Sequence, residues 1–233
     1  MVGMRRALAL LLLAPALLTG CGSGPGSAAQ ARPSAHGWHG VEPSPVPERP
    51  AFVLTDTDGK PYDFRARTAG KPTLVYFGYT NCPDLCPTAM ADIAAALRTT
   101  ARDVRDDVVV VFVTTDPDRD SAPVIRRFLD QFSAGFVGLR GTQAQVDAAQ
   151  EAAGVDPAKR EGAVPTLPGR PDQHVHQEGT APHQHFGPLG YAVAHSAVIF
   201  AYDADDRLPV VYPDGVTPAD IAADLPALAD PPA

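Results

Sequence analysis

Residues 71–90, "KPTLVYFGYTNCPDLCPTAM", decide the fold class of this chain. Their first part, "KPTLVYFGY", is a continuous apolar run, which is typical of a β-strand that is buried on both faces. The continuation over 86–104, "CPTAMADIAAALRTTARDV", places Met90, Ile93 and Leu97 at helical spacing. A buried strand that leads directly into an amphipathic helix indicates an α/β fold with a partly parallel sheet.

The elements around this unit follow the same alternation of strands and helices. Asp58 and Gly59 predict the turn of an N-terminal β-hairpin, Ser121 is a candidate N-cap, and Pro226 is expected to interrupt the last helix. The expected elements are the hairpin over 51–64, a buried strand over 107–115, helices over 121–132 and 142–154, strands over 195–203 and 208–213, and a final helix over 217–229.

The first twenty residues have the pattern of an export signal. Arg5 and Arg6 precede the run "ALALLLLAPALL", which is too short to span a bilayer as a permanent anchor. The run ends in "LTGC", which resembles a bacterial lipobox and implies cleavage before Cys21 and diacylglycerol on its sulfur. An ordinary secretory signal is the alternative. We expect a lipid-anchored protein at the extracytoplasmic face of the bacterial cell membrane.

Composition divides the mature chain into two parts. Residues 22–50 are rich in Gly, Ser, Pro and Ala, which indicates a flexible tether. We therefore expect a signal peptide over 1–20, a lipidated cysteine with its tether over 21–50, and one folded domain over 51–233. The chain has 19 basic and 27 acidic side chains, a formal net charge of −8. This balance does not suit binding to a nucleic-acid backbone.

Cys82 and Cys86 lie where the buried strand ends and the helix begins, the edge at which α/β sheets collect ligands. A helix N-terminus is expected to lower the pKa of a thiol there. Residues at i and i+4 have β-carbons roughly 5–6 Å apart, whereas a disulfide needs about 3.5–4.5 Å. A metal ion between two sulfurs, at about 2.3 Å from each, fits the wider separation. Metal binding is favoured, and dithiol redox chemistry stays open because Cys82 lies in a loop.

Two thiolates need a further ligand, and His195 is the one histidine inside a predicted structured segment, "YAVAHSAVIFAYD". We expect it to fold back over the cysteine pair; a hydrogen-bonded structural histidine is the alternative. Two sulfurs and one nitrogen form a soft ligand set that favours Cu(I), and imidazole also suits Cu(II). Ligand type alone does not exclude zinc.

Residues 161–190 form a predicted loop that is rich in Pro, Gly and His. A loop of this length tends to be functional or disordered. Histidines two residues apart in an extended chain point to the same side, so each pair is a candidate auxiliary site for Cu(II) or Zn(II). A solvated polar loop is the alternative. The four histidines are His174, His176, His183 and His185.

Three ordered motifs, "GYTNCPDLCPTAM", "VTTDPDRDSAPV" and "YAVAHSAVIF", and the opening "LTDTDGKPYDF" resemble the Sco (SenC-type) copper chaperones. The resemblance runs from about Ala51 to the end of the chain. It implies a thioredoxin-like fold, here with the N-terminal hairpin and a His-rich loop insertion, and copper binding by Cys82, Cys86 and His195. It also implies assembly of the dinuclear copper centre of cytochrome c oxidase. The expected partners are the copper-bearing subunit of the oxidase and, as further candidates, other copper chaperones.

Two acidic residues agree with the family pattern, and one residue departs from it. Asp116 and Asp120 match the acidic motif of the family, which implies support of the copper ligands or docking of a partner. The alternative is that Asp116 and Pro117 only shape the loop after a strand. Ala194 stands where many members carry an aspartate before the histidine, and this leaves the orientation of the ligand open.

Two functions compete on this evidence. The first is a metallochaperone, which is not an enzyme. The second is a thiol–disulfide oxidoreductase that reduces the copper-ligand cysteines of the oxidase. His195 separates them, because metal transfer needs this residue and dithiol exchange does not. A thioredoxin-like peroxidase is disfavoured, because no lone activated cysteine in a peroxide pocket is recognisable.

Overall fold

The structure, a computed structural model, describes residues 37–161, 192–194 and 196–231. In these ranges a seven-stranded mixed sheet has the order β2-β1-β5-β4-β3-β8-β9, and β6 and β7 form a separate ribbon. The strands are β1 (Val53–Asp56), β2 (Pro61–Asp63), β3 (Thr73–Gly78), β4 (Val109–Thr114), β5 (Val137–Arg140), β6 (Lys159–Glu161), β7 (Ala192–Ala194), β8 (Ile199–Tyr202) and β9 (Val210–Tyr212). The helices are α1 (Phe64–Thr68), α2 (Leu85–Thr99), α3 (Arg102–Arg105), α4 (Ala122–Leu129), α5 (Gln143–Ala152) and α6 (Pro218–Ala229).

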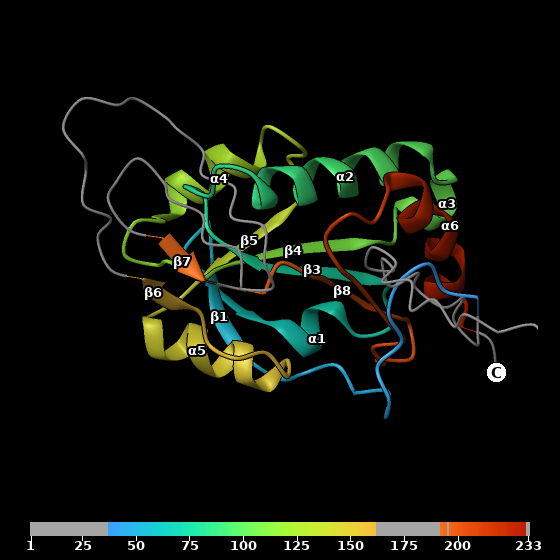
Figure 1. The fold of residues 1–233 in the computed structure, drawn as a ribbon, viewed down its shortest axis with the longest axis horizontal. Coiled ribbons are helices and arrows are strands. Elements are labelled where there is room, and N and C mark those ends of the chain that lie inside the picture. Colours follow the sequence, from blue (N-terminus) through green and yellow to red (C-terminus); the bar gives the residue numbers. More distant parts are fainter. Residues whose placement is uncertain (1–36, 162–191, 195, 232–233) are drawn as a thin grey trace, which may run out of the picture. The chain divides into compact units, whose positions relative to one another are not determined.

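Helices cover both faces of the sheet (Figure 1). The side chains of α2, α4 and α6 pack into one core cluster on one face, and those of α1 and α5 lie on the other face. Strands β3, β4 and β5 run parallel, and every residue of β3 is buried. The predicted α/β class with a partly parallel sheet is therefore confirmed. The carboxyl ends of the three parallel strands meet at one edge of the sheet, where the cysteine motif begins.

The predicted hairpin is present as β1 and β2, which pair antiparallel with Leu54 opposite Tyr62. Gly59 closes its turn with a φ of 79°, a conformation that glycine adopts without strain. The helix expected over 86–104 is divided into α2 and α3, because Thr100 adopts an extended conformation after α2. Met90 and Ile93 are fully buried, as their helical spacing predicts.

Ser121 is the N-cap of α4, as expected, although its side chain makes no capping hydrogen bond. Two other elements differ from the sequence expectations. Helix α6 continues through Pro226, because Leu225 and Leu228 on either side of it are fully buried and hold the helix on the core. Strand β5 was not expected. It contains Gly138, where a β-carbon would lie 2.4 Å from the Ile125 side chain of α4, so glycine here allows close packing of helix on strand.

The packed unit also includes residues 37–50, which the composition assigned to the tether. Val41 forms an antiparallel bridge with Val211 of β9, and Glu48 forms one with Arg207. The next residue, Arg49, is fully buried. The polar composition of this segment conceals these attachments, which depend on partners more than 150 residues further along the chain.

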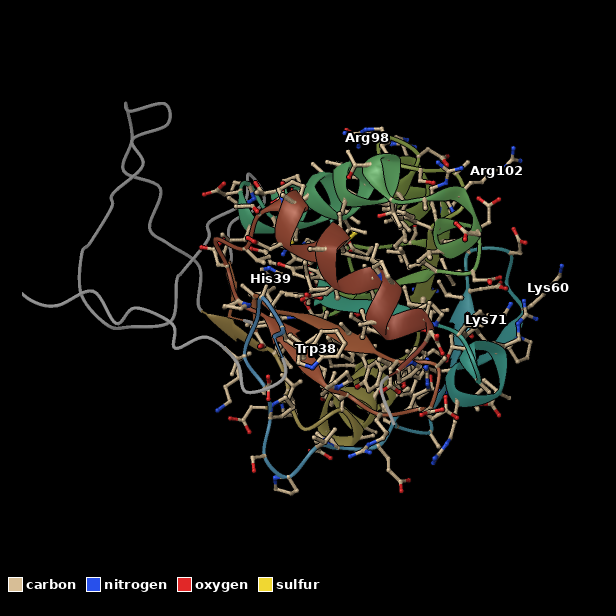
Figure 2. All side chains as sticks on the ribbon, turned by 90° about the vertical axis from the view of Figure 1, so that its right-hand side faces the viewer. Trp38, His39, Lys60, Lys71, Arg98 and Arg102 are labelled. Atoms are coloured by element: carbon tan, nitrogen blue, oxygen red, sulfur yellow. The ribbon has the colours of Figure 1, made fainter. Side chains whose placement is uncertain are left out.

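His39 fastens the beginning of this segment to α6. Its Nδ1 lies 2.6 Å from Asp224 Oδ1, and its backbone N–H donates to Asp224 Oδ2 at 3.0 Å. The hydroxyl of Tyr212 donates to the same Oδ2 at 3.0 Å. Figure 2 shows His39 and the neighbouring Trp38 beside this helix. The hydrogen bond to Asp224 raises the pKa of His39, and Asp220 adds to the effect.

The His39 contact predicts a pH-dependent contribution to stability. Because the pKa of His39 is raised in the folded state, the contribution is complete below about pH 6.5, the unfolded value, and is lost as the pH rises through the folded value. His39→Gln is therefore expected to lower the melting temperature more at about pH 5.5 than at about pH 8.5. Calorimetry of both proteins at both pH values measures this difference. Equal losses at the two pH values would contradict it.

Candidate metal centre

Cys82 and Cys86 lie at the carboxyl edge of the sheet. Cys82 is in the loop after β3, and Cys86 is the second residue of α2. Cys82 is 5% exposed and Cys86 is fully buried, and no disulfide joins the two thiols. The backbone N–H of Cys86 donates to Cys82 Sγ at 3.4 Å, and the backbone N–H of Cys82 donates to the Tyr79 carbonyl at 3.3 Å. The turn at the start of α2 therefore holds the two sulfurs together at one place.

The end of β3 leaves room for the inner thiol. A β-carbon at Gly78 would lie 2.9 Å from Cys86 Sγ and 2.6 Å from the Tyr76 ring. Real β-carbons do not approach other atoms so closely, so only glycine at this position lets Cys86 and Tyr76 share the space beneath α2.

Burial controls the protonation of Cys86. Desolvation raises the pKa of its thiol well above the usual value, and contact with the Cys82 thiol raises it further. A hydrogen bond from Tyr76 opposes the rise without cancelling it. The expected lowered pKa is therefore wrong for Cys86: burial outweighs the effect of the helix N-terminus, because the thiol is shielded from water and a neutral sulfur is favoured there.

Asp120 ties the cysteine loop to the end of β4. Its carboxylate accepts hydrogen bonds from the Thr80 backbone N–H at 3.0 Å, the Thr80 hydroxyl at 2.5 Å and the Thr114 hydroxyl at 2.5 Å. The residue is fully buried, and this burial raises the pKa of the carboxyl group. Because Thr80 is two residues before Cys82, Asp120 fixes the loop that carries the outer thiol.

Asp116 is also fully buried, and two arginines reach it. Arg119 forms an ion pair with Oδ2, and Arg160 Nη2 lies 3.5 Å from Oδ1. Between the two acidic residues, Asp118 has a side chain that is 69% exposed. In this chain both acidic residues of the motif thus point inward, and neither presents its carboxylate on the surface.

The third predicted ligand, His195, lies outside the described residues, as do Cys21 and the loop histidines His174, His176, His183 and His185. In the parts of the chain that the structure describes, no three His, Cys, Asp or Glu side chains gather as a metal site. The flanks of position 195 are described. Val193 is 1% exposed and belongs to the same core cluster as the two cysteines. On the other side, Ile199 of β8 pairs with Tyr76 of β3.

Several residues around the site were not singled out from the sequence. They are Gly78, Tyr76, Tyr79 and Arg160. The only signal for the first three was their place in the run "YFGY" next to the cysteine motif. Arg160 had no signal, because it lies 44 residues from Asp116.

Comparison with known proteins assigns the chain to a family. The family model described as SCO1/SenC matches residues 42–230. The chain belongs to the SCO1/SenC family. Protein SenC of Rhodobacter capsulatus is 46% identical over 82 residues, which is 35% of this chain and 37% of that protein. The SCO1/SenC chain thus spans less than two thirds of the length of curated relatives such as this one and the SCO1 homolog 1 of Arabidopsis thaliana.

Solved structures of the family share the fold. Bradyrhizobium japonicum ScoI with copper bound is 30% identical, with a TM-score of 0.59 over 78% of this chain and 99% of that chain. BsSco, described as a cytochrome c oxidase assembly protein of the Sco family with a disulfide switch, is 17% identical. Its TM-score is 0.53 over 82% of this chain and 99% of that chain, which shows the fold alone. The predicted thioredoxin-like fold is confirmed, and the His-rich insertion lies outside the described residues.

This SCO1/SenC chain has no helix, within the segments that the structure describes, that is long and apolar enough to cross a membrane.

Proposed function

We propose that this SCO1/SenC protein binds copper through Cys82, Cys86 and His195 and delivers it to the dinuclear copper centre of cytochrome c oxidase. One observation carries the proposal: two buried thiols lie in contact at the carboxyl edge of the sheet. Two sulfurs next to an imidazole form a donor set that suits copper. Support also comes from ScoI, whose structure holds copper.

Copper is the cargo in this proposal, and the protein prepares its binding site. Asp120 holds the loop of Cys82, and Gly78 leaves the space in which the Cys86 sulfur lies. The two thiols must release their protons when a metal replaces them, and the α2 N-terminus favours the negative charge that develops on the sulfurs. Membership of a family of oxidase assembly proteins supports the copper-bearing subunit of the oxidase as the client. Lipidation at Cys21 would keep the domain at the extracytoplasmic membrane surface, close to that client.

Replacing both thiols, Cys82→Ser with Cys86→Ser, is expected to weaken copper binding by more than about 100-fold. Mutation of residues that only orient metal ligands already lowers affinity about 10–100-fold. The strong sulfur-to-copper absorption bands of the Cu(II) protein should disappear. Both quantities are measured by competitive titration and visible spectroscopy of the soluble domain. All proteins carry alanine at the four loop histidines, so that auxiliary copper does not conceal the result.

Thr88→Ser, an exposed change on the same helix, is the matched control and should bind copper as the parent does. Tight binding with unchanged absorption bands in the double cysteine variant would place the site elsewhere.

A thiol–disulfide oxidoreductase is the second candidate, because the two thiols already contact each other. In that reaction Cys82 and Cys86 form a disulfide, and two electrons and two protons pass to a disulfide of the client. His195→Ala distinguishes the candidates. A chaperone should lose copper affinity and support of the oxidase, whereas an oxidoreductase should keep both dithiol exchange and oxidase assembly at limiting copper.

A further inference from the structure

The β6–β7 ribbon lies apart from the main sheet, at the end of the sheet where the cysteine motif begins (Figure 1). Among the described strands, β6 and β7 pair only with each other, with Arg160 opposite Val193. The hydrogen-bond ladder of the sheet therefore does not hold the ribbon in place. Side-chain contacts must do this.

The first set of contacts joins β7 to the cysteine loop. Val193 is 1% exposed and packs in the core cluster that contains Cys82 and Cys86. A hydrogen bond also links the Val193 backbone to the side chain of Tyr79. Burial raises the pKa of the Tyr79 hydroxyl, and this hydrogen bond reduces the rise. The backbone carbonyl of Tyr79 in turn accepts a hydrogen bond from the backbone N–H of Cys82.

The second set of contacts joins β6 to the acidic loop. Arg160 Nη2 lies 2.6 Å from Asp118 Oδ2 and 3.5 Å from Asp116 Oδ1. Because Asp116 is fully buried, the pair reaches into the domain and is not confined to its surface. Arg119, the other partner of Asp116, has its guanidinium over the Tyr79 ring at 5.6 Å. Asp116 is therefore the point at which the ribbon and the cysteine loop are tied to the same group.

We infer that Arg160 is a positioning residue of the copper site: held by Asp116 and Asp118, it fixes the β6–β7 ribbon against the loop that carries Cys82. The effect of Arg160 on copper binding rests on the proposed function, in which His195 is a ligand. Position 195 follows β7 directly in the chain. A ribbon that moves away from the loop would move the chain that leads to the proposed histidine ligand. The guanidinium does not bind the metal, and it acts through the placement of the ribbon.

The test compares three variants of the domain that lacks the four loop histidines. Arg160→Gln removes the charge and keeps most of the side-chain length, and Arg160→Lys restores the charge. Arg102→Gln is the control, because the Arg102 side chain in α3 is 85% exposed and forms a surface ion pair with Asp106, which directly follows that helix. Amide hydrogen exchange of the metal-free proteins reports on the ribbon, and Cu(II) absorption with competitive titration reports on the site.

Arg160→Gln is expected to raise exchange in β6 and β7 roughly fivefold, while exchange in β3 and β4 stays unchanged. Copper binding should weaken by about tenfold, and the sulfur-to-copper bands should shift. Loss of residues that orient metal ligands typically has effects of this size. Arg160→Lys should recover part of both effects, and Arg102→Gln should change neither.

Two results would overturn the inference. One is unchanged exchange of the ribbon in Arg160→Gln, and the other is faster exchange with the affinity and the bands of the parent protein. Failure of the proposed function looks different, because the parent domain itself would then not bind copper through its thiols. In that case the exchange measurement alone still decides whether Arg160 anchors the ribbon.

Discussion

Replacing Arg49 by alanine is expected to lower the free energy of unfolding by about 3–5 kcal/mol, the usual cost of breaking a buried charge pair. The guanidinium is fully buried, and its Nε lies 2.7 Å from Asp206 Oδ1. It also donates to the Thr73 hydroxyl at 2.7 Å. Two further bonds reach the carbonyls of Lys71, at 2.9 Å, and Asp203, at 2.7 Å. Without Arg49 the Asp206 carboxylate loses its positive partner and the Thr73 hydroxyl loses its donor. The carbonyls of Lys71 and Asp203 each keep one other donor, from Thr73 and Asp206.

Urea unfolding of the two proteins measures the Arg49 effect. Arg65→Ala is the matched control, because the Arg65 side chain is 44% exposed and its partner Glu48 is 80% exposed. Such surface pairs contribute about 0–1 kcal/mol. A similar small loss for Arg49→Ala would mean that the segment before β1 is not fastened by this residue.

Asp120→Ala is expected to lower the free energy of unfolding by about 2–4 kcal/mol, because it leaves three donors of Thr80 and Thr114 without their acceptor. The loop before Cys82 should loosen at the same time. Urea unfolding measures the first effect, and the rate at which a thiol reagent modifies Cys82 measures the second.

The control for Asp120 is Asp130→Ala, at the end of α4. The Asp130 side chain is 51% exposed and pairs with Arg126 on the surface, so its loss should cost less than about 1 kcal/mol and leave the reactivity of Cys82 unchanged. Equal effects of the two substitutions would remove the distinction between the buried and the exposed carboxylates.

The parts of the fold that the sequence predicted are those with a strong local pattern. The apolar run of β3 and the helical spacing of Met90 and Ile93 identify the strand and the helix that carry the cysteines. Strands β5, β6 and β7 have no such pattern. Gly138 weakens β5 as a local signal, and its pairing depends on the packing of α4 against it. The ribbon has three residues in each strand, too few to show a period.

In the candidate site, too, some features follow from the local sequence and others only from the fold. Its sulfur atoms follow from the spacing of Cys82 and Cys86, which is local information. The raised pKa of Cys86 does not, because it comes from the whole core that closes over the helix N-terminus. Asp116 is held by the nearby Arg119 and also contacts Arg160, which is 44 residues away in sequence and which no local pattern indicates. Motif matching therefore names candidate ligands, whereas their electrostatic surroundings follow only from the folded structure.

On the proposed lipidation of Cys21, the attachment of residues 37–50 to the domain would shorten the linker between the lipid and the folded unit. An extended chain gains at most about 3.5 Å per residue, so fixing this segment removes roughly 50 Å from the distance that the domain can travel from the bilayer. The linker joins the domain beside α6, where His39 contacts Asp224, and not at the first strand of the sheet. On the proposed function, a client in the membrane would therefore meet the cysteine edge within a narrower range of heights and orientations, and its effective concentration at the cysteine edge would be higher.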